Sequence, residues 1–434
     1  MSSRRSDNLA LPLHSGWWET SRANLPVPIV LAIVAAIGFL VIERAVDAYH
    51  LRIIMLIGFN IILAVSLQLI NGFSGQFSLG HAGFMAVGAY MAAYPAINIS
   101  TGMADPFACL WFFIALGVLV SIIGLVMLLL FWSIRATGKL HPMLPLILLT
   151  LLSGWVLIDF ALVGQTQRAP AAFWSHMAGH LSTLFMWLIS VGAPIASKLS
   201  PWLPSFTREP ICFLVLVLGG GACAGAVGLI VGMPALRLRG DYLAIATLGF
   251  AEIIRILIQN SQPLGGALGL TNIPKQTNFA WLYGFAVVTV IVIWRVAYSA
   301  KGRAIMAVRE DEVAASATGI DPTHHKVMAF VIGSFFGGVA GALYALHERS
   351  IAPYQFGLAK SIESVVMVTL GGLGSISGAI LAAIVLTLLP ELLRSIAEYR
   401  MIIYSLLLVF MMILRPQGLL GGRELWPGRW RRRE

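Results

Sequence analysis

Charged residues are scarce in this chain. Only 11% of its 434 residues are Asp, Glu, Lys or Arg, whereas soluble domains carry about 25%. Hydrophobic residues make up 58% of the sequence, and the mean hydropathy is +0.86. A water-soluble fold of this length cannot bury so much apolar surface, so the composition excludes an ordinary cytosolic enzyme and a disordered protein. It indicates a chain that is solvated largely by lipid.

Cysteine is also rare, and the three cysteines lie in apolar runs. Cys212 and Cys223 fall on one expected helix, about 16 Å apart at a rise of about 1.5 Å per residue, which is too far for a disulfide. No cluster of Cys and His has the spacing of a metal site. We therefore expect the cysteines to be packing residues, with neither a disulfide scaffold nor a metal.

The sequence lacks the signatures of nucleotide binding and catalysis. It has no G-x-x-x-x-G-K-[ST] loop, because Gly138-Lys139 is followed by Leu140 and lacks the upstream glycine. It has no nucleophile elbow and no H-E-x-x-H motif. We therefore expect this chain to carry no cofactor and to have no enzymatic activity of its own.

Apolar runs near bilayer length fill the sequence instead. The stretch 171–190 mixes Ser and His with Trp and Leu, and we expect it to lie at the membrane interface. The pattern predicts an all-α fold, a polytopic integral membrane helical bundle with broken or re-entrant helices. The apolar runs are 27–42, 53–70, 78–98, 107–134, 143–163, 211–236, 243–258, 279–298, 327–346, 361–390 and 401–414.

The distribution of loop charges orients this bundle. With the N-terminus inside, 18 of the 29 lysines and arginines lie in inside loops and ten in outside loops, among them Lys360 in the loop 347–360. Because cytoplasmic loops are rich in Lys and Arg, both termini are predicted to be cytoplasmic. The run 361–390 must then cross twice, or enter and leave by one side. The same bias explains the net charge of +10, so we expect no nucleic-acid partner.

Two glycine-rich segments interrupt the expected spans, at 71–83 and 371–378. Non-helical backbone at membrane depth is tolerated only inside protein or along a wet path, and transporters build substrate sites from broken helices. The segments are predicted to form broken helices or a translocation path; the alternative is close glycine-mediated helix packing. Both contain Gly-x-x-Gly-x-x-Ser, formed by Gly72, Gly75 and Ser78 and by Gly371, Gly374 and Ser377.

Ionisable residues inside the spans are further candidates. Glu252 and Arg255 are three residues apart and so share a helix face, where they are predicted to form an intramembrane polar pair. The pair either serves function or locks two helices together. One hypothesis for His81 is that it senses protons or contacts a ligand. The alternative is that it simply forms a hydrogen bond within the protein. Asp241 follows Gly240 at a helix start and is expected to cap it.

The one polar block between spans is 299–326. Apolar residues recur at helical spacing from Lys301 to Gly319, which predicts one amphipathic cytoplasmic helix that Gly319 ends and Pro322 prevents from continuing. Such a helix is a candidate for docking a partner protein, or else a solvated connection.

Several segments match one family in order, among them NGFSGQFSLGHAGFMAVGAY (71–90), LRLRGDYLAIATLGFAEIIRIL (236–257) and SAKGRAIMAVREDEVAASATGID (299–321). They resemble the M-type permease subunit of bacterial branched-chain amino-acid ABC importers. The segments GGALGLTNIP (265–274), FVIGSFFGGVAGALYA (330–345), VTLGGLGSISGAI (368–380) and RPQGLLGG (415–422) match too. The chain then divides into an N-terminal extension with one helix (1–50), a first permease segment (51–98), variable helices with an outer loop (99–210), a permease core (211–422) and a basic tail (423–434).

The resemblance implies a pore half in the bacterial inner membrane. It would pair with an H-type permease, two cytoplasmic ATPase subunits that bind the ATP, and a periplasmic substrate-binding protein. The family's coupling loop has the pattern Glu-Ala-Ala-x-x-x-Gly, which Ala314, Ala315 and Gly319 fit while Val313 takes the Glu position. The ATPase-coupling residues implied are Arg309, Glu310, Asp311, Glu312, Ala314, Ala315 and Gly319.

The function implied is inward movement of Leu, Ile and Val, driven by ATP hydrolysis on the partner chains. One alternative is a related ABC permease for urea or small amides. Another is an ion-coupled secondary transporter that uses His81 with Glu252 and Arg255. A membrane enzyme is a third class, but the sequence lacks the clustered catalytic polar residues that it would need.

Overall fold

The computed structural model describes residues 47–98, 108–114, 116–117, 205–235, 238 and 240–393, and parts of 405–424. The expected helix 27–42, the run 143–163 and the interfacial stretch 171–190 lie outside the described residues, as do most of the runs 107–134 and 401–414. The chain forms two compact units, one of residues 1–93 and 220–434 and one of residues 94–219.

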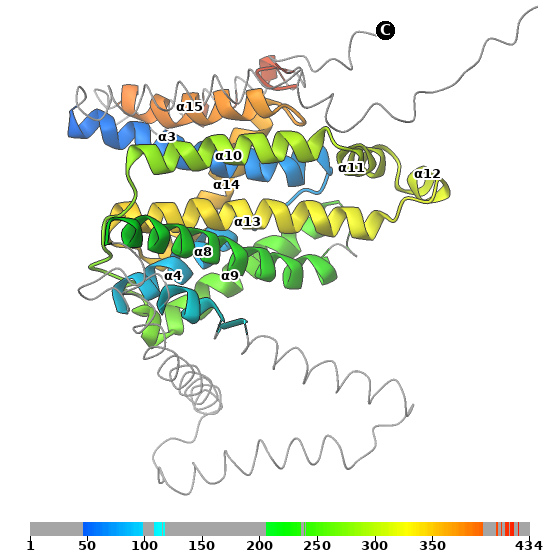
Figure 1. Ribbon diagram of the computed structural model, residues 1–434. Coiled ribbons are helices and arrows are strands. Elements are labelled where there is room, and N and C mark those ends of the chain that lie inside the picture. The colour runs from blue at the N-terminus through cyan, green and yellow to red at the C-terminus, as the bar shows by residue number, and fades with distance from the viewer. Residues whose placement is uncertain are drawn as a thin grey trace, which may run out of the picture. The chain divides into compact units, whose positions relative to one another are not determined.

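Helices make up the described structure, which confirms the predicted all-α membrane bundle (Figure 1). The described part contains four helices that are long and apolar enough to cross a membrane. An isolated antiparallel bridge joins Leu270 to Ile351 outside the helices. The four candidate spans are Ala48–Phe73, Arg208–Ala235, Phe279–Ala297 and Pro322–Glu348.

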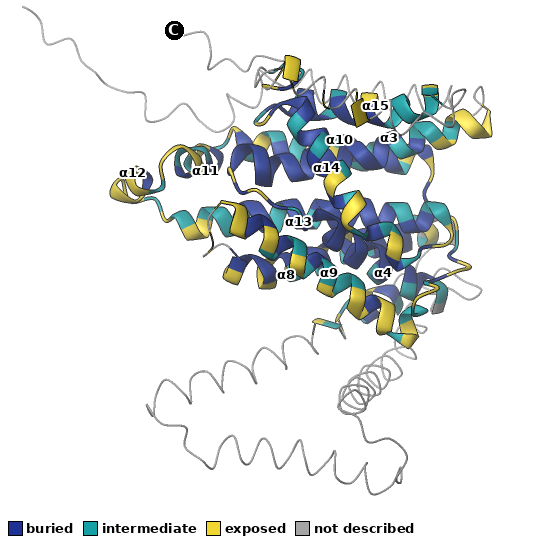
Figure 2. Ribbon diagram, turned by 180° about the vertical axis from the view of Figure 1, so that it is seen from behind, coloured by how far each residue is buried: buried dark blue, intermediate teal, exposed yellow. Residues whose placement is uncertain are grey.

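Helix α3 (Ala48–Leu67) forms the centre of the first unit and continues into the π-helical turn η1 (Gln68–Phe73). It is apolar on every face, which is typical of a helix that other helices surround. Helices α10 (Phe279–Ala297), α13 (Pro322–Glu348) and α15 (Ile376–Leu392) pack against it. Figure 2 shows the resulting contrast between buried stretches of α3 and α13 and exposed residues on α9 and α12.

Helix α13 also packs against α4 (His81–Asn98) and α8 (Ser205–Ala235). A Cβ atom added at Gly88 on α4 would lie 2.0 Å from the carbonyl oxygen of Gly338 on α13. Backbones this close require glycine, as is common where membrane helices cross. Glycine-mediated helix packing therefore occurs in this bundle outside the two interrupted segments as well.

The apolar run 361–390 contains two helices, α14 (Leu358–Gly371) and α15, joined by a short turn and packed against each other. Two helices joined by a turn fit both arrangements that the loop charges allow for this run, two crossings or entry and exit by one side. The short helix η4 (Pro353–Phe356) precedes α14.

Helix α9 (Asp241–Asn260) begins differently from the sequence expectation. Gly240 holds the N-cap position, and no side chain caps the helix, so the prediction that Asp241 is the cap was wrong. Asp241 lies instead in the first turn, where a carboxylate complements the helix dipole. The short helix η3 (Gln262–Leu264) follows α9.

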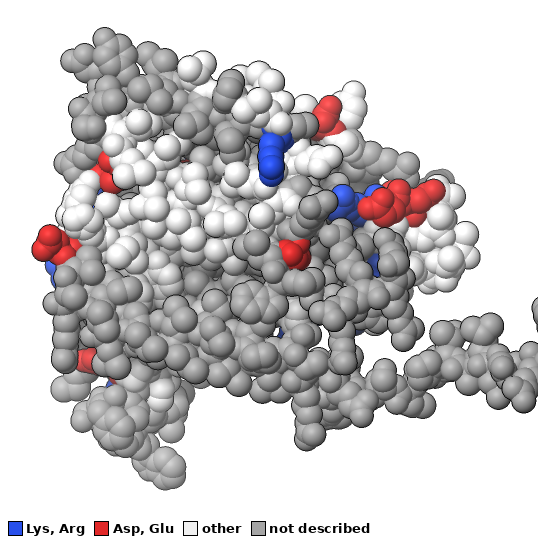
Figure 3. All heavy atoms as spheres, turned by 90° about the horizontal axis from the view of Figure 1, so that it is seen from above, with Lys and Arg blue, Asp and Glu red and all other residues white. Residues whose placement is uncertain are grey.

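The block 299–326 contains two helices, α11 (Ala300–Glu310) and α12 (Glu312–Ala317), instead of the predicted single one. Asp311 separates them because its backbone is extended and its carboxylate accepts from the amides of Val313 and Ala314, at 2.8 and 3.0 Å. In Figure 1 α11 lies beyond the end of α10, and α12 lies beyond the ends of both α10 and α13. In the view of Figure 3 most charged side chains of the described residues lie near the left and right edges, and the described surface between them is largely uncharged.

Candidate coupling and translocation site

The first glycine-rich segment forms a break between α3 and α4. Gly72 lies in the turn η1, and Gly75 adopts φ +67°, in the left-handed region that favours glycine. Extended chain follows, and Asn71 accepts from the amide of Ser78 at 3.1 Å and donates to its carbonyl at 3.4 Å. Hydrogen bonds inside the protein thus hold the non-helical backbone that the sequence predicted here. π-Helical turns of this kind are frequent at functional sites.

The second glycine-rich segment forms the turn between α14 and α15. Gly371 is the last residue of α14, and Gly372 and Gly374 adopt φ values of +106° and +87°. Ser377 lies in the first turn of α15, where its amide and hydroxyl donate to a carboxylate oxygen of Glu424 at 3.1 and 2.5 Å. Sequence reasoning missed Glu424, since it assigned the residue to the basic tail.

The two breaks meet each other. A Cβ atom at Gly72 would lie 2.7 Å from the backbone nitrogen of Gly374. The buried side chain of Gln68, one turn before Gly72, donates to the carbonyls of Gly372 at 2.9 Å and Ser375 at 3.2 Å. A movement at one break therefore changes the contacts of the other.

Arg309, at the end of α11, reaches this junction. Its Nη1 donates to the carbonyl oxygen of Gly72 at 2.6 Å, and lies 3.4 Å from where a Cβ of Gly374 would be. Its Cγ lies 2.7 Å from the corresponding position at Gly75. The sequence assigned Arg309 to ATPase coupling, and the structure places its side chain against both broken helices.

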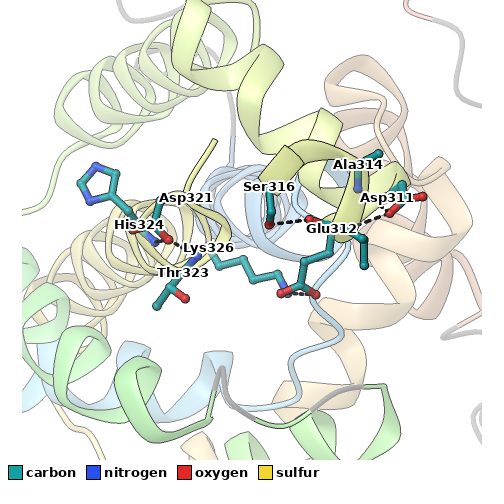
Figure 4. A network of polar contacts seen from close by, with 9 residues as sticks. Asp311, Glu312, Ala314, Ser316, Asp321, Thr323, His324 and Lys326 are labelled. Atoms are coloured by element: carbon teal, nitrogen blue, oxygen red, sulfur yellow. Dashed lines mark hydrogen bonds and ion pairs between the residues drawn. The ribbon is translucent and has the colours of Figure 1, made fainter. Parts of the chain in front are cut away.

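The other residues expected to couple to the ATPase, and their neighbour Val313, differ in how far their side chains are exposed. Ala315 is 4% exposed and packs inside the protein, whereas Val313 on the same short helix is 75% exposed. Figure 4 shows how α12 is held: Lys326 reaches from α13 to Glu312, at 3.0 Å. Gly319 adopts φ +85° in open space, so it turns the chain back toward α13. Glu310, Asp311 and Ala314 are exposed, and Glu312 is half-buried.

His81, the first residue of α4, is fully buried. Its Nε2 lies 2.7 Å from the hydroxyl of Ser66 on α3, which is the internal hydrogen bond that the sequence left as one option. Its Nδ1 has no hydrogen-bond partner among the residues that the structure describes. The neighbouring amides of Leu79 and Ala82 donate to Thr247 on α9 and Ser361 on α14. Three helices thus converge on the start of α4.

Glu252 and Arg255 form the predicted pair. The Nε of Arg255 donates to Oε1 of Glu252 at 2.9 Å, and its Nη2 contacts the same oxygen. Gln259, one turn further along α9, accepts from Nη1 of Arg255 at 3.3 Å. Both partners lie on one helix, so this pair does not lock two helices together. Their side chains are 41% and 25% exposed.

Comparison with known proteins identifies the family of this chain. The family described as "Branched-chain amino acid transport system / permease component" matches residues 175–414. The chain belongs to this family. It is similar to the high-affinity branched-chain amino acid transport system permease protein LivM of Salmonella typhimurium and of Escherichia coli, with 40% identity over 235 residues, 46% of this chain and 55% of each relative.

The family includes relatives of a second kind. The permease protein LivH of Escherichia coli is 31% identical over 147 residues, which cover 33% of this chain and 47% of the relative. The chain thus spans about half the length of the curated relatives it matches. No solved structure matches the chain. Family membership and the apolar helices make this a multi-pass membrane permease component.

One charged group of this permease component escaped the sequence analysis. Lys360 was assigned to an outer loop, but it lies in α14, where its Nζ donates to Oδ1 of Asn60 at 2.9 Å and to Oε2 of Glu363 at 3.0 Å. The i, i+3 spacing of Lys360 and Glu363 at the edge of an apolar run is the same signal that identified Glu252 and Arg255.

Proposed function

We propose that this chain is the membrane-spanning permease subunit of an ABC importer that carries branched-chain amino acids into the cell. Membership of the branched-chain permease family supports the substrate class. The observation that carries the mechanism is the position of Arg309, which links the cytoplasmic helix α11 to Gly72 and to the second break. A permease driven from outside its own chain needs such a mechanical link.

The small helix α12 is the proposed contact with the ATPases. Val313 presents an apolar side chain at an exposed tip, and Asp311 and Lys326 hold the helix in place around it. ATP is bound and hydrolysed on two cytoplasmic partner subunits, and this chain needs no cofactor. When the ATPases close, α12 and α11 move, and Arg309 carries the displacement to the broken helices. The ATPases thereby favour one of two bundle conformations.

The remaining partners follow from the same proposal. A LivH-type permease completes the pore in the bacterial inner membrane, and a periplasmic binding protein delivers the substrate. Both termini of this chain are then cytoplasmic. A weak substrate site suffices in the permease, because the binding protein supplies the affinity and tight binding would slow release.

The test is uptake by proteoliposomes that contain this chain, an H-type permease, the ATPases and the binding protein. We expect uptake of radiolabelled leucine that requires both ATP and the binding protein. Competition by urea or acetamide instead of isoleucine and valine would indicate the related amide importers. Uptake that a proton or sodium gradient drives without ATP would instead support a secondary transporter and overturn the proposal.

A further inference from the structure

Lys360 contacts a residue near the middle of a candidate membrane span. Its partner Asn60 lies twelve residues into the 26-residue helical run Ala48–Phe73. At about 1.5 Å per residue, Asn60 is about 18 Å from the start of a run about 39 Å long. A charge at that depth is costly and is a functional candidate by default.

Three helices build the surroundings of this lysine. The amide Nδ2 of Asn60 on α3 donates to Oγ1 of Thr387 on α15 at 2.8 Å, and Thr387 donates in turn to the carbonyl of Ala383 at 2.6 Å. This chain of hydrogen bonds orients the amide so that its oxygen faces Lys360 on α14. We call Asn60, Lys360, Glu363 and Thr387 the mid-membrane polar cluster.

The mid-membrane polar cluster is partly open. The side chains of Lys360 and Glu363 are 22% and 36% exposed, on a helix that is mostly buried only from Ser364 onward. Leu358 and Ile362, on the neighbouring face of the same turns, are exposed apolar side chains. Lipid is a poor cover for an ion pair, so the open side requires water, a polar ligand or protein.

We propose that the mid-membrane polar cluster is a transient substrate site, in which Lys360 binds the α-carboxylate and Glu363 the α-ammonium group of an amino acid. This site rests on the proposed function, and deepens it by naming the residues that recognise the substrate's backbone charges. The aliphatic side chain of the substrate packs on Leu358 and Ile362.

The chemistry of the pair fits a zwitterion. Lys360 and Glu363 neutralise each other, and Asn60 keeps the lysine oriented. An amino acid brings one negative and one positive charge, so it exchanges partners with the pair without changing the net charge at mid-membrane depth. Because an internal ion pair must be broken, the affinity is low, which suits a site that must release its ligand.

The test uses the complete importer in proteoliposomes and measures leucine uptake and ATP hydrolysis together. The variants are Lys360→Gln, Glu363→Gln and the double change, which removes both charges and leaves no unpaired ion. We expect binding-protein-stimulated ATP hydrolysis to stay near the wild-type rate, while leucine uptake per ATP falls about tenfold or more in all three, since charge-assisted hydrogen bonds to the substrate are lost.

The double variant separates a substrate site from a structural pair. If the pair only stabilises the fold, the double variant has no unpaired charge, and its uptake per ATP returns to the wild-type value although each single variant loses uptake. This result overturns the inference. Parallel loss of ATP hydrolysis and uptake in all three variants overturns it too. The matched control is Arg52→Gln, which removes the ion pair between Arg52 near the start of α3 and Glu348 at the end of α13. This change should leave uptake per ATP unchanged. If the wild type takes up no branched-chain amino acid with ATP, the proposed function itself is wrong, and the substrate site falls with it.

Discussion

The guanidinium of Arg309 donates to the carbonyl oxygen of Gly72 at 2.6 Å, across 237 positions of sequence. This hydrogen bond joins the end of α11 to the π-helical turn that ends the candidate span Ala48–Phe73. Because the side chain also lies against Gly75 and near Gly374, one residue contacts both interrupted segments.

Replacing Arg309 should uncouple ATP hydrolysis from transport. In Arg309→Gln the ATPases should still co-purify with the permease, because the exposed tip of α12 is unchanged. Leucine uptake per ATP should fall about tenfold, since a hydrogen bond from a charged donor is lost together with its packing on Gly75. Arg303→Gln on the same helix is the control, as Arg303 donates to the nearby carbonyl of Tyr298. Equal effects of the two substitutions would contradict the role of Arg309.

Val313→Asp should weaken the attachment of the ATPases. The valine is 75% exposed, so the change does not disturb the packing of this chain. In the proposed contact with an ATPase, however, an aspartate would bury a charge that has no partner, which is costly. We expect less co-purified ATPase and little stimulated hydrolysis, while the permease still inserts normally. Tyr354→Asp, with equal exposure at the opposite end of α13, should change neither quantity. Ala315→Trp is a poorer probe, because buried Ala315 has no room for the indole. Full retention of the ATPases by Val313→Asp would exclude this docking surface.

Valine at Gly75 or Gly374 should impair transport far more than valine at Gly284. The first two residues adopt φ values of +67° and +87°, which cost a residue with a side chain about 1–2 kcal/mol, and the Gly75 Cβ would also collide with Arg309. Gly284 lies within α10 with open space around its Cβ position. Initial rates of leucine uptake, normalised to protein in the membrane, provide the measurement. Similar rates at all three positions would mean that the breaks serve only packing.

The pair of Glu252 and Arg255 should show non-additive losses of stability. Each single change to Ala removes the same interaction, so the double change should cost less than the sum of the single ones. Because both side chains are partly exposed, we expect a coupling energy of about 1 kcal/mol or less in detergent. Thermal unfolding of the purified permease measures it, with Asn260→Ala as a control on the same helix, because the Asn260 amide donates to the carbonyl of Ile256. Strictly additive losses would show that the observed ion pair contributes nothing to stability.

The membrane class, most described spans and the two interrupted segments follow from the sequence by itself. Hydrophobic run length reports bilayer thickness, and glycine at Gly75 and Gly374 reports a backbone that other residues avoid. The pairing of Glu252 with Arg255 was predictable for the same reason, since three residues along a helix set the distance between the two side chains.

Only the tertiary structure decides which distant groups meet. Helical periodicity identified the apolar face of the 299–326 block, but not that Asp311 would cap a second helix, that Ala315 would be buried, or that Arg309 would turn toward Gly72. Local spacing carries no information about a contact between residues hundreds of positions apart.

Because local spacing does not report distant contacts, the sequence assigned Lys360 to a loop and Glu424 to the basic tail. Lys360 stands at the edge of an apolar run, and only the packing of α14 against α3 brings it to Asn60, near the middle of the candidate span Ala48–Phe73. Glu424 lies among basic residues in sequence, yet its carboxylate accepts from the amides at the start of α15. Sequence by itself determined that the chain is a multi-pass membrane protein and where two of its helices break. Tertiary packing decided which charged groups reach those breaks, because a buried charge or a free helix end takes whichever complementary group the fold brings near it.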